Sequence, residues 1–194
     1  YYPEQWDRAL WEKDAELMAK TGVKTVRIAE FAWSKIEPRD GEFDFTWLDE
    51  AVRIFARFGL DVVMCIPTNC PPLWLYESHP EIIQTGLDGN RIQTGIRGHR
   101  CINSPVFMTY AKRITEHLVR RFNTNSSIVA WQIDNELEAY PCTCDTCKEL
   151  FRNWLIDKHD TIENINAAFG TSVWSGEYSD ISQIMPPTAY PKAW

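Results

Sequence analysis

The pattern that most constrains the fold is a strict alternation of short apolar runs with amphipathic helical segments. Residues 23–29 (VKTVRIA), 60–66 (LDVVMCI) and 126–134 (SSIVAWQID) are apolar runs of strand length. The segment after residue 45 carries apolar residues at the helical spacing i, i+3, i+4, i+7, i+8: Leu48, Ala51, Val52, Phe55 and Ala56. Because strand and helix in strict order build parallel βα units, the sequence predicts an α/β fold.

Local signals predict where several helices begin and which faces they bury. The helix before residue 21 should bury one stripe: Trp6, Leu10, Leu17 and Met18. Thr46 and Asp49 match a capping box, and Ser104-Pro105 matches a cap followed by proline at the first helical position. Two further helices are expected near the carboxyl end, at 162–169 and along the stripe Cys147, Leu150, Phe151, Trp154 and Leu155.

Residues 67–103 break the alternation. They are rich in Pro and Gly and predict an irregular connection of roughly 37 residues, where about 2–6 is usual in α/β units. Long connections after strands commonly form the walls or lids of functional sites. Residues 185–194 (MPPTAYPKAW) hold three prolines and have the composition of a linker.

Charge and hydropathy exclude two classes of partner. The net charge is −7 and no basic cluster is present, which argues against nucleic-acid binding. No run of 18 apolar residues occurs, so we expect no membrane span. The chain starts at Tyr1 without Met, which is consistent with removal of a leading segment; a cytoplasmic location is the working expectation.

Polar side chains end the last apolar run. Asp134, Asn135 and Glu136 follow Trp131-Gln-Ile directly, and unpartnered polar groups of this kind cost about 2–7 kcal/mol each in an apolar interior. They are therefore expected at the strand's carboxyl end, where α/β folds place their chemistry. A Glu beside a neutral Asn suits an acid/base group with a hydrogen-bonding neighbour, although a solvated Asn-Glu turn is the plainer alternative.

Two further groups have open interpretations. Glu30 and Trp33, after residues 23–29, either wall a cleft or serve the structure, Glu30 through an ion pair. Cys142, Cys144 and Cys147 have the spacing C-x-C-x-x-C, and Cys101 is the natural fourth member. Four thiolates form a closed tetrahedral site for structural Zn(II); the alternative is reduced thiols without metal.

Together these motifs resemble glycoside hydrolase family 42, the β-galactosidases. The resemblance rests on YYPEQW at the start, VRIAEFAWSKIEP, WQIDNE and the four cysteines, and it covers residues 1 to about 180. It implies a (β/α)8 TIM barrel, of which residues 1–194 are roughly the N-terminal half of a catalytic domain. It also implies a retaining mechanism acting on terminal β-galactosides.

The resemblance assigns roles to particular residues. Glu136 corresponds to the acid/base and Asn135 to its sugar-contacting neighbour. Arg97, four residues before Cys101, corresponds to a sugar-contacting arginine. Trp174 corresponds to a tryptophan that reaches a neighbouring subunit's cleft in trimers, so the full-length protein is expected to be a homo-oligomer.

A retaining glycosidase also needs a nucleophilic carboxylate about 5–5.5 Å from the acid/base. The family has it on a later strand, and Glu177, the only Glu after Trp174, lacks that context. We therefore expect the nucleophile beyond Trp194, part of the first strand to be missing, and the isolated chain to be inactive, with open, association-prone sheet edges. Two alternatives stay open: a non-catalytic, zinc-stapled module that binds carbohydrate or a partner, and a related clan A β-glycosidase for another sugar.

Overall fold

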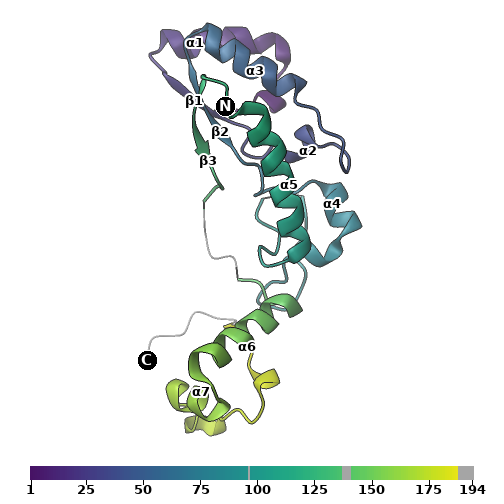
Figure 1. Ribbon diagram of the computed structural model, residues 1–194, viewed down its shortest axis with the longest axis vertical. Helices are drawn as coiled ribbons and strands as arrows, with labels where there is room; N and C mark the ends of the chain where they lie inside the picture. The colour runs from purple at the N-terminus through teal and green to yellow at the C-terminus, as the bar shows by residue number, and fades with distance from the viewer. Residues whose placement is uncertain (96, 137–140, 188–194) are drawn as a thin grey trace. The chain divides into compact units, whose positions relative to one another are not determined.

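The computed structural model describes residues 1–95, 97–136 and 141–187 (Figure 1). The chain divides into two compact units. Unit 1 comprises Tyr1–Ile82 and Gln93–Ala139, and unit 2 comprises Ile83–Ile92 and Tyr140–Trp194.

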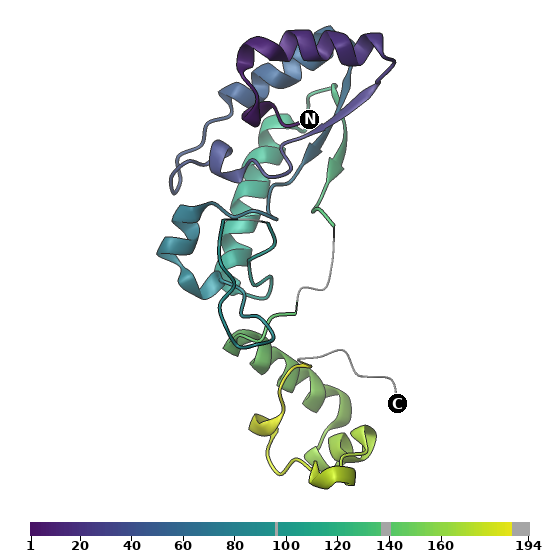
Figure 2. The ribbon, with the colours of Figure 1, turned by 180° about the vertical axis from the view of Figure 1, so that it is seen from behind.

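Unit 1 is built on a three-stranded parallel sheet in the order β1-β2-β3 (Figures 1 and 2). Its strands are β1 (Thr25–Ile28), β2 (Asp61–Cys65) and β3 (Ile128–Gln132). Each lies inside one of the three predicted apolar runs, so the strand predictions are confirmed. The helices of unit 1 are η1 (Pro3–Gln5), η2 (Arg8–Leu10), α1 (Trp11–Lys20), α2 (Trp33–Ile36), α3 (Thr46–Arg57), α4 (Leu73–Ser78), η3 (Pro80–Ile82) and α5 (Pro105–Phe122).

The predicted buried stripe of the first helix is wrong. Trp6, Leu10 and Leu17 are about half exposed, whereas Trp11 and Ala15 are the buried residues of α1. The cause is local: residues 8–10 form a 3₁₀ turn in which the Ala9 N–H donates to the Asp7 side chain. The α-helix therefore starts only at Trp11, and the face that packs on α3 is set by that start.

Two local predictions in the middle of unit 1 are also wrong. Thr46 and Asp49 form no capping box: Thr46 donates to Asp44 Oδ1 through its N–H (2.9 Å) and hydroxyl (2.6 Å), while Asp49 pairs with Arg121. The segment 67–103 is not wholly irregular, since it contains α4 and η3.

The predicted start of α5 is confirmed, and α5 is linked to the segment after β1. Ser104 caps the helix by accepting from the Phe107 N–H at 3.3 Å, and Pro105 is its first residue. Glu37, fully buried, accepts from Trp33 Nε1 and from the Gly41 N–H, both at 2.9 Å, and pairs with Arg113 of α5. Because every donor around this carboxylate is supplied by the protein, its burial is compensated.

Unit 2 is a small helical unit with its own core. Its helices are α6 (Asp145–His159), α7 (Ile162–Phe169), η4 (Val173–Ser175) and η5 (Ile181–Gln183). Leu155, Ile165 and Ile184 form the core. The helix predicted at 162–169 is confirmed. In the stripe predicted for α6, Cys147 and Leu155 are buried but Leu150 and Trp154 are about half exposed. Of the predicted linker 185–194, residues 188–194 lie outside the described residues.

The described part of β3 pairs with β2 along one side. β3 is the last strand of the described sheet, which agrees with the expected open edge. Val129 and Ile133, in and just after β3, are 53% and 79% exposed. No helix of the described residues is long and apolar enough to cross a membrane.

The burial pattern generates a stability prediction. Leu118 of α5 is fully buried and Leu17 of α1 is 49% exposed. Leu118→Ala should lower the free energy of unfolding by about 2–5 kcal/mol, because it leaves a cavity in the core. Leu17→Ala should change it by less than about 1 kcal/mol. Denaturant unfolding of this chain measures both, and equal losses would contradict the observed face of α1.

Candidate active site and cysteine cluster

The three polar residues after β3 each have defined partners within unit 1. Asp134 Oδ2 pairs with Arg100 Nη2 at 2.9 Å, and the Arg100 side chain is almost completely buried. Asn135 is 7% exposed, and its backbone carbonyl accepts from Asn69 Nδ2 at 2.9 Å. The Glu136 side chain, by contrast, is 53% exposed. The strand end thus holds two anchored residues followed by one open carboxyl group.

Arg97 and Glu136, both singled out in the sequence, lie in direct contact. Arg97 Nη2 is 2.6 Å from Glu136 Oε2. In the amide orientation that satisfies its neighbours, Asn135 Oδ1 accepts from Arg97 Nη1 at 3.1 Å. Asn135 and Glu136 are adjacent in the sequence, and Arg97 is far from both. The structure brings the three residues together at one end of the sheet.

The other end of the Asn135 amide donates to Glu30. Glu30 follows β1 and is only 3% exposed. It also accepts from Tyr2 Oη (2.9 Å), Arg27 Nη2 (3.1 Å) and Gln132 Nε2 (3.3 Å). Of the two interpretations left open, the ion pair of Glu30 is present. Burial, and then the hydrogen bond to Glu30, raises the pKa of Tyr2, so its hydroxyl stays a donor.

Trp33 does not wall a cleft. Its side chain is fully buried and donates to Glu37, so that half of the cleft interpretation is wrong. The link between Glu30 and Asn135 was not predicted from the sequence. The available signal was an acidic residue directly at the end of an apolar run, in the same position relative to β1 as Asp134–Glu136 to β3.

Backbone conformation is unusual at both ends of this network. Ala29 has φ 68° and Glu136 has φ 46°, values that place non-glycine residues in the sparsely populated left-handed region. Such residues persist where the surrounding contacts over-determine them, and they concentrate at functional sites. Ala29 directly precedes Glu30, and the second residue with a positive φ is Glu136 itself.

A pocket of about 680 Å³ adjoins Arg97. Its wall includes Phe31, Leu73 and Trp74, and the Trp74 indole is fixed by donating to the Glu37 carbonyl at 2.9 Å. Cys70 also lines the pocket, and burial raises its pKa to about 11. It is therefore a neutral thiol near pH 7 and belongs to the wall as an apolar group.

Trp174, predicted as a substrate contact, lies in η4 of unit 2. It is 85% exposed and has φ 69°, so a large aromatic side chain is held out into solvent by an unusual backbone.

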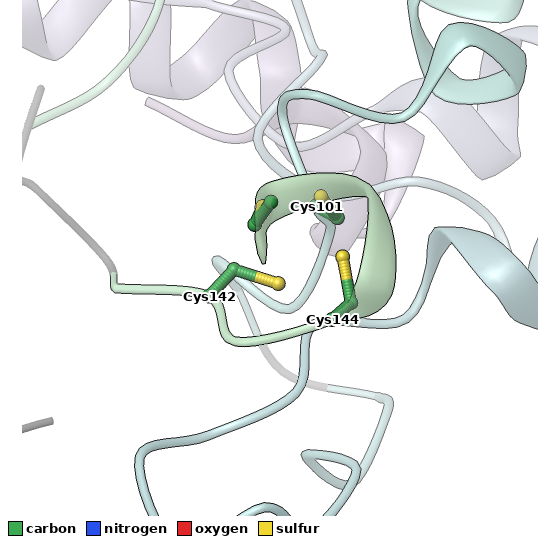
Figure 3. Close-up of side chains that lie close together, drawn as sticks. Cys101, Cys142 and Cys144 are labelled. Atoms are coloured by element: carbon green, nitrogen blue, oxygen red, sulfur yellow. The ribbon is translucent and has the colours of Figure 1, made fainter. Parts of the chain in front are cut away.

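The four predicted cysteine ligands come together (Figure 3). The Sγ atoms of Cys101, Cys142, Cys144 and Cys147 all lie within 4.8 Å of one another. Tetrahedral coordination with metal–sulfur bonds of 2.3 Å places sulfurs about 3.8 Å apart, so small side-chain shifts would seat one ion. The cluster could hold a metal.

Local contacts position the cysteines of residues 142–147. Cys144 is the N-cap residue of α6. Cys142 Sγ accepts from the Thr85 N–H at 3.4 Å. Thr143 is fixed to the segment 85–86 by bonds from its N–H to the Thr85 carbonyl (2.9 Å) and from its hydroxyl to the Gly86 carbonyl (2.7 Å).

The carboxylates differ in what they are able to do. Glu30 is surrounded by donors and Asp134 is paired with a buried arginine, so both act as fixed acceptors. Glu136 alone in this described network combines exposure with a single charged partner. The arrangement is thus suited to binding a polyhydroxylated ligand and transferring a proton at Glu136.

Comparisons with known proteins place this architecture. The family profile of glycoside hydrolase family 42, described as beta-galactosidase, matches residues 1–193. A beta-galactosidase from Clostridium cellulovorans is 54% identical over 187 residues, covering 96% of this chain and 28% of the relative. A beta-galactosidase from Thermus thermophilus is 40% identical over 190 residues, covering 96% and 30%.

Solved structures agree. A polyextremophilic beta-galactosidase from the Antarctic haloarchaeon Halorubrum lacusprofundi superposes with a TM-score of 0.90 at 39% identity, over 98% of this chain and 29% of that one. The beta-galactosidase from Bacillus circulans gives 0.90 at 32% identity, over 100% and 29%. The chain thus spans less than a third of the length of these relatives. Its parallel sheet and flanking helices correspond to part of the (β/α)8 barrel of these relatives. The chain belongs to glycoside hydrolase family 42.

Proposed function

We propose that this chain supplies the acid/base part of a retaining β-galactosidase active site, as the N-terminal portion of its catalytic domain. The observation that carries the proposal is the contact of Glu136 with Arg97 and, through Arg97, with Asn135 at the end of β3. The sugar comes from the relatives, which are named beta-galactosidases.

Glu136 would first donate its proton to the oxygen that leaves the sugar. It would then remove a proton from the water that releases the sugar from the enzyme. Its 53% exposure leaves the carboxyl group accessible to a substrate. The partner carboxylate, needed about 5–5.5 Å away in a retaining enzyme, would come from sequence outside these 194 residues.

Asn135 and Arg97 would hold the substrate against Glu136. The Asn135 amide carries a second N–H beyond the one given to Glu30, and it suits a sugar hydroxyl as a donor. Arg97 has further N–H groups and also lines the adjoining pocket. That pocket combines aromatic and aliphatic side chains with one cation, which suits the mixed polar and apolar faces of a sugar ring.

Glu136→Gln in the full-length protein should lower kcat on lactose by about 10²–10⁴-fold, since the amide cannot transfer a proton. Hydrolysis kinetics measure the loss. The matched control is Glu42→Gln, which removes another exposed, arginine-paired carboxylate, held by Arg39 at 3.2 Å. The control should keep wild-type kinetics.

Added azide assigns the role of Glu136 more narrowly. In Glu136→Ala, azide should restore turnover of an activated aryl galactoside and give a β-galactosyl azide, because a small anion enters the space left by a base. Unchanged activity in Glu136→Gln would remove Glu136 as acid/base. A full-length protein that binds galactosides but hydrolyses none would indicate the non-catalytic module instead, and hydrolysis of other β-glycosides in preference would change the sugar.

We further propose that the metal of the four-cysteine cluster is Zn(II). Four thiolates close the tetrahedral shell, so the ion would have no open position for substrate and would act structurally by holding its four cysteine ligands together. A reducing compartment such as the cytoplasm suits thiolate ligands.

Purified protein prepared without chelator should contain about one zinc per chain and show no visible absorption, which separates zinc from an iron–sulfur centre. Cys144→Ala should lose most of the metal because a three-thiol site binds more weakly. Cys70→Ala, outside the cluster, should retain it. Elemental analysis measures all three; equal metal in both variants, or far less than one zinc in the wild type, would contradict the assignment.

We also propose that Trp174 meets a neighbouring subunit in a homo-oligomer such as a trimer. Its 85% exposure supports a role outside its own unit. Trp174→Ala should raise KM for lactose more than it lowers kcat, while Trp154→Ala, a half-exposed tryptophan of the same unit, serves as the control. Light scattering reports the oligomeric state, and a monomeric wild type with normal activity would contradict this role.

A further inference from the structure

Glu30 is a buried carboxylate for which the proposed proton transfer has no use. It is 3% exposed, so it has almost no contact with solvent or substrate. Its two oxygens accept from four side chains: Tyr2, Arg27, Gln132 and Asn135. An ionised carboxylate is an acceptor only, and all four of these side chains donate to it.

The contact with Asn135 has a directional consequence. A side-chain amide has a donor end and an acceptor end. Glu30 accepts and Arg97 donates, so the amide lying between them satisfies both neighbours in one orientation only. In that orientation Asn135 Oδ1 receives Arg97 Nη1 at 3.1 Å, and Arg97 Nη2 reaches Glu136 Oε2 at 2.6 Å. A continuous chain of hydrogen bonds therefore runs from the buried carboxylate to the exposed one.

The anchoring of Glu30 is independent of Glu136. Arg27 binds both Glu30 and the Gln132 carbonyl oxygen Oε1 (2.8 Å), which leaves the Gln132 amide nitrogen facing Glu30. Arg27 of β1 thus sets the orientation of the Gln132 amide of β3. Ala29, with φ 68° and a fully buried side chain, fixes the backbone immediately before Glu30.

We propose that Glu30 is a positioning residue of the active site: by fixing the orientation of the Asn135 amide, it places Arg97 against Glu136 and turns the second amide N–H toward the substrate. This inference rests on the proposed function, because it concerns the same acid/base. Its plain competitor is a purely structural ion pair with Arg27.

Glu37 provides a matched control for that competitor. It is also a buried carboxylate of unit 1, with an arginine partner (Arg113) and two N–H donors. It has no described contact with Asn135, Arg97 or Glu136. Removing its charge therefore reports the structural cost of losing a buried carboxylate without touching the proposed chain of contacts.

The experiment compares Glu30→Gln, Glu37→Gln, Asn135→Ala and the double variant Glu30→Gln/Asn135→Ala in the full-length protein. The amide of Glu30→Gln presents a donor where four donors converge, so the Asn135 orientation is no longer fixed. We expect kcat/KM to fall about 10- to 100-fold. Glu37→Gln should lower the melting temperature but keep kcat/KM within about twofold.

The double variant separates positioning from structure. If Glu30 acts through Asn135, Glu30→Gln should cost less than about threefold in the Asn135→Ala background, because contacting residues of one network are not additive. An undiminished loss in that background, or a Glu30→Gln variant with wild-type kcat/KM, would overturn the proposal. Should Glu30→Gln fail to fold, Glu30→Asp keeps the charge beside Arg27 while drawing back from Asn135, with the same expectations.

Crystal structures give a readout that does not depend on turnover. In the wild-type protein, Arg97 should contact both Asn135 and Glu136, and in Glu30→Gln it should leave at least one of them. Arg97 unchanged in the variant would overturn the positioning role. Failure of the proposed function would give a different result: the wild-type protein would hydrolyse no β-galactoside, or the Glu136→Gln variant would stay active.

Discussion

Parallel pairing of β1, β2 and β3 is the constraint on which the site depends. The carboxyl ends of parallel strands lie at the same end of the sheet, so residues that follow different strands meet there. Glu30 follows β1, Asn69 lies four residues beyond β2, and Asn135 follows β3. The contacts of Asn135 with both of the others are direct results of this topology. If one of these strands were antiparallel to the others, the residue that follows it would lie at the opposite end of the sheet.

Charge alternates through the network, and this makes its burial tolerable. Arg27 lies beside Glu30, and Arg100 lies beside Asp134. Arg100 also donates to Asn69 Oδ1 at 3.3 Å, which connects the second strand's loop to the same system. A buried charge with one missing partner costs several kcal/mol, so each member of such a network depends on the others. Glu136, the proposed acid/base, lies at the exposed end of this network, where its carboxyl group is accessible.

The sequence was most informative where one interaction determines a structure. Three apolar runs predicted three strands, and the Ser104-Pro105 cap predicted the start of α5. The sequence-based predictions were wrong where two local structures compete. The 3₁₀ turn at 8–10 changes the buried face of α1, and Thr46 donates to Asp44 instead of forming the expected capping box with Asp49. The contact between Glu30 and Asn135 joins residues more than a hundred positions apart. Only the parallel pairing of the strands makes them neighbours; the one local signal is that each residue follows the end of an apolar run.

Ala29 has a strained backbone conformation at this end of the sheet. A glycine would adopt φ 68° without steric cost, whereas an alanine there is held against its own preference by about 1 kcal/mol. The alanine methyl group is fully buried, so it also removes the freedom that glycine would restore. With alanine, the backbone that carries Glu30 has fewer conformations available than it would have with glycine. This restriction of the backbone beside Glu30 is present before any ligand binds, so binding energy need not be used to create it.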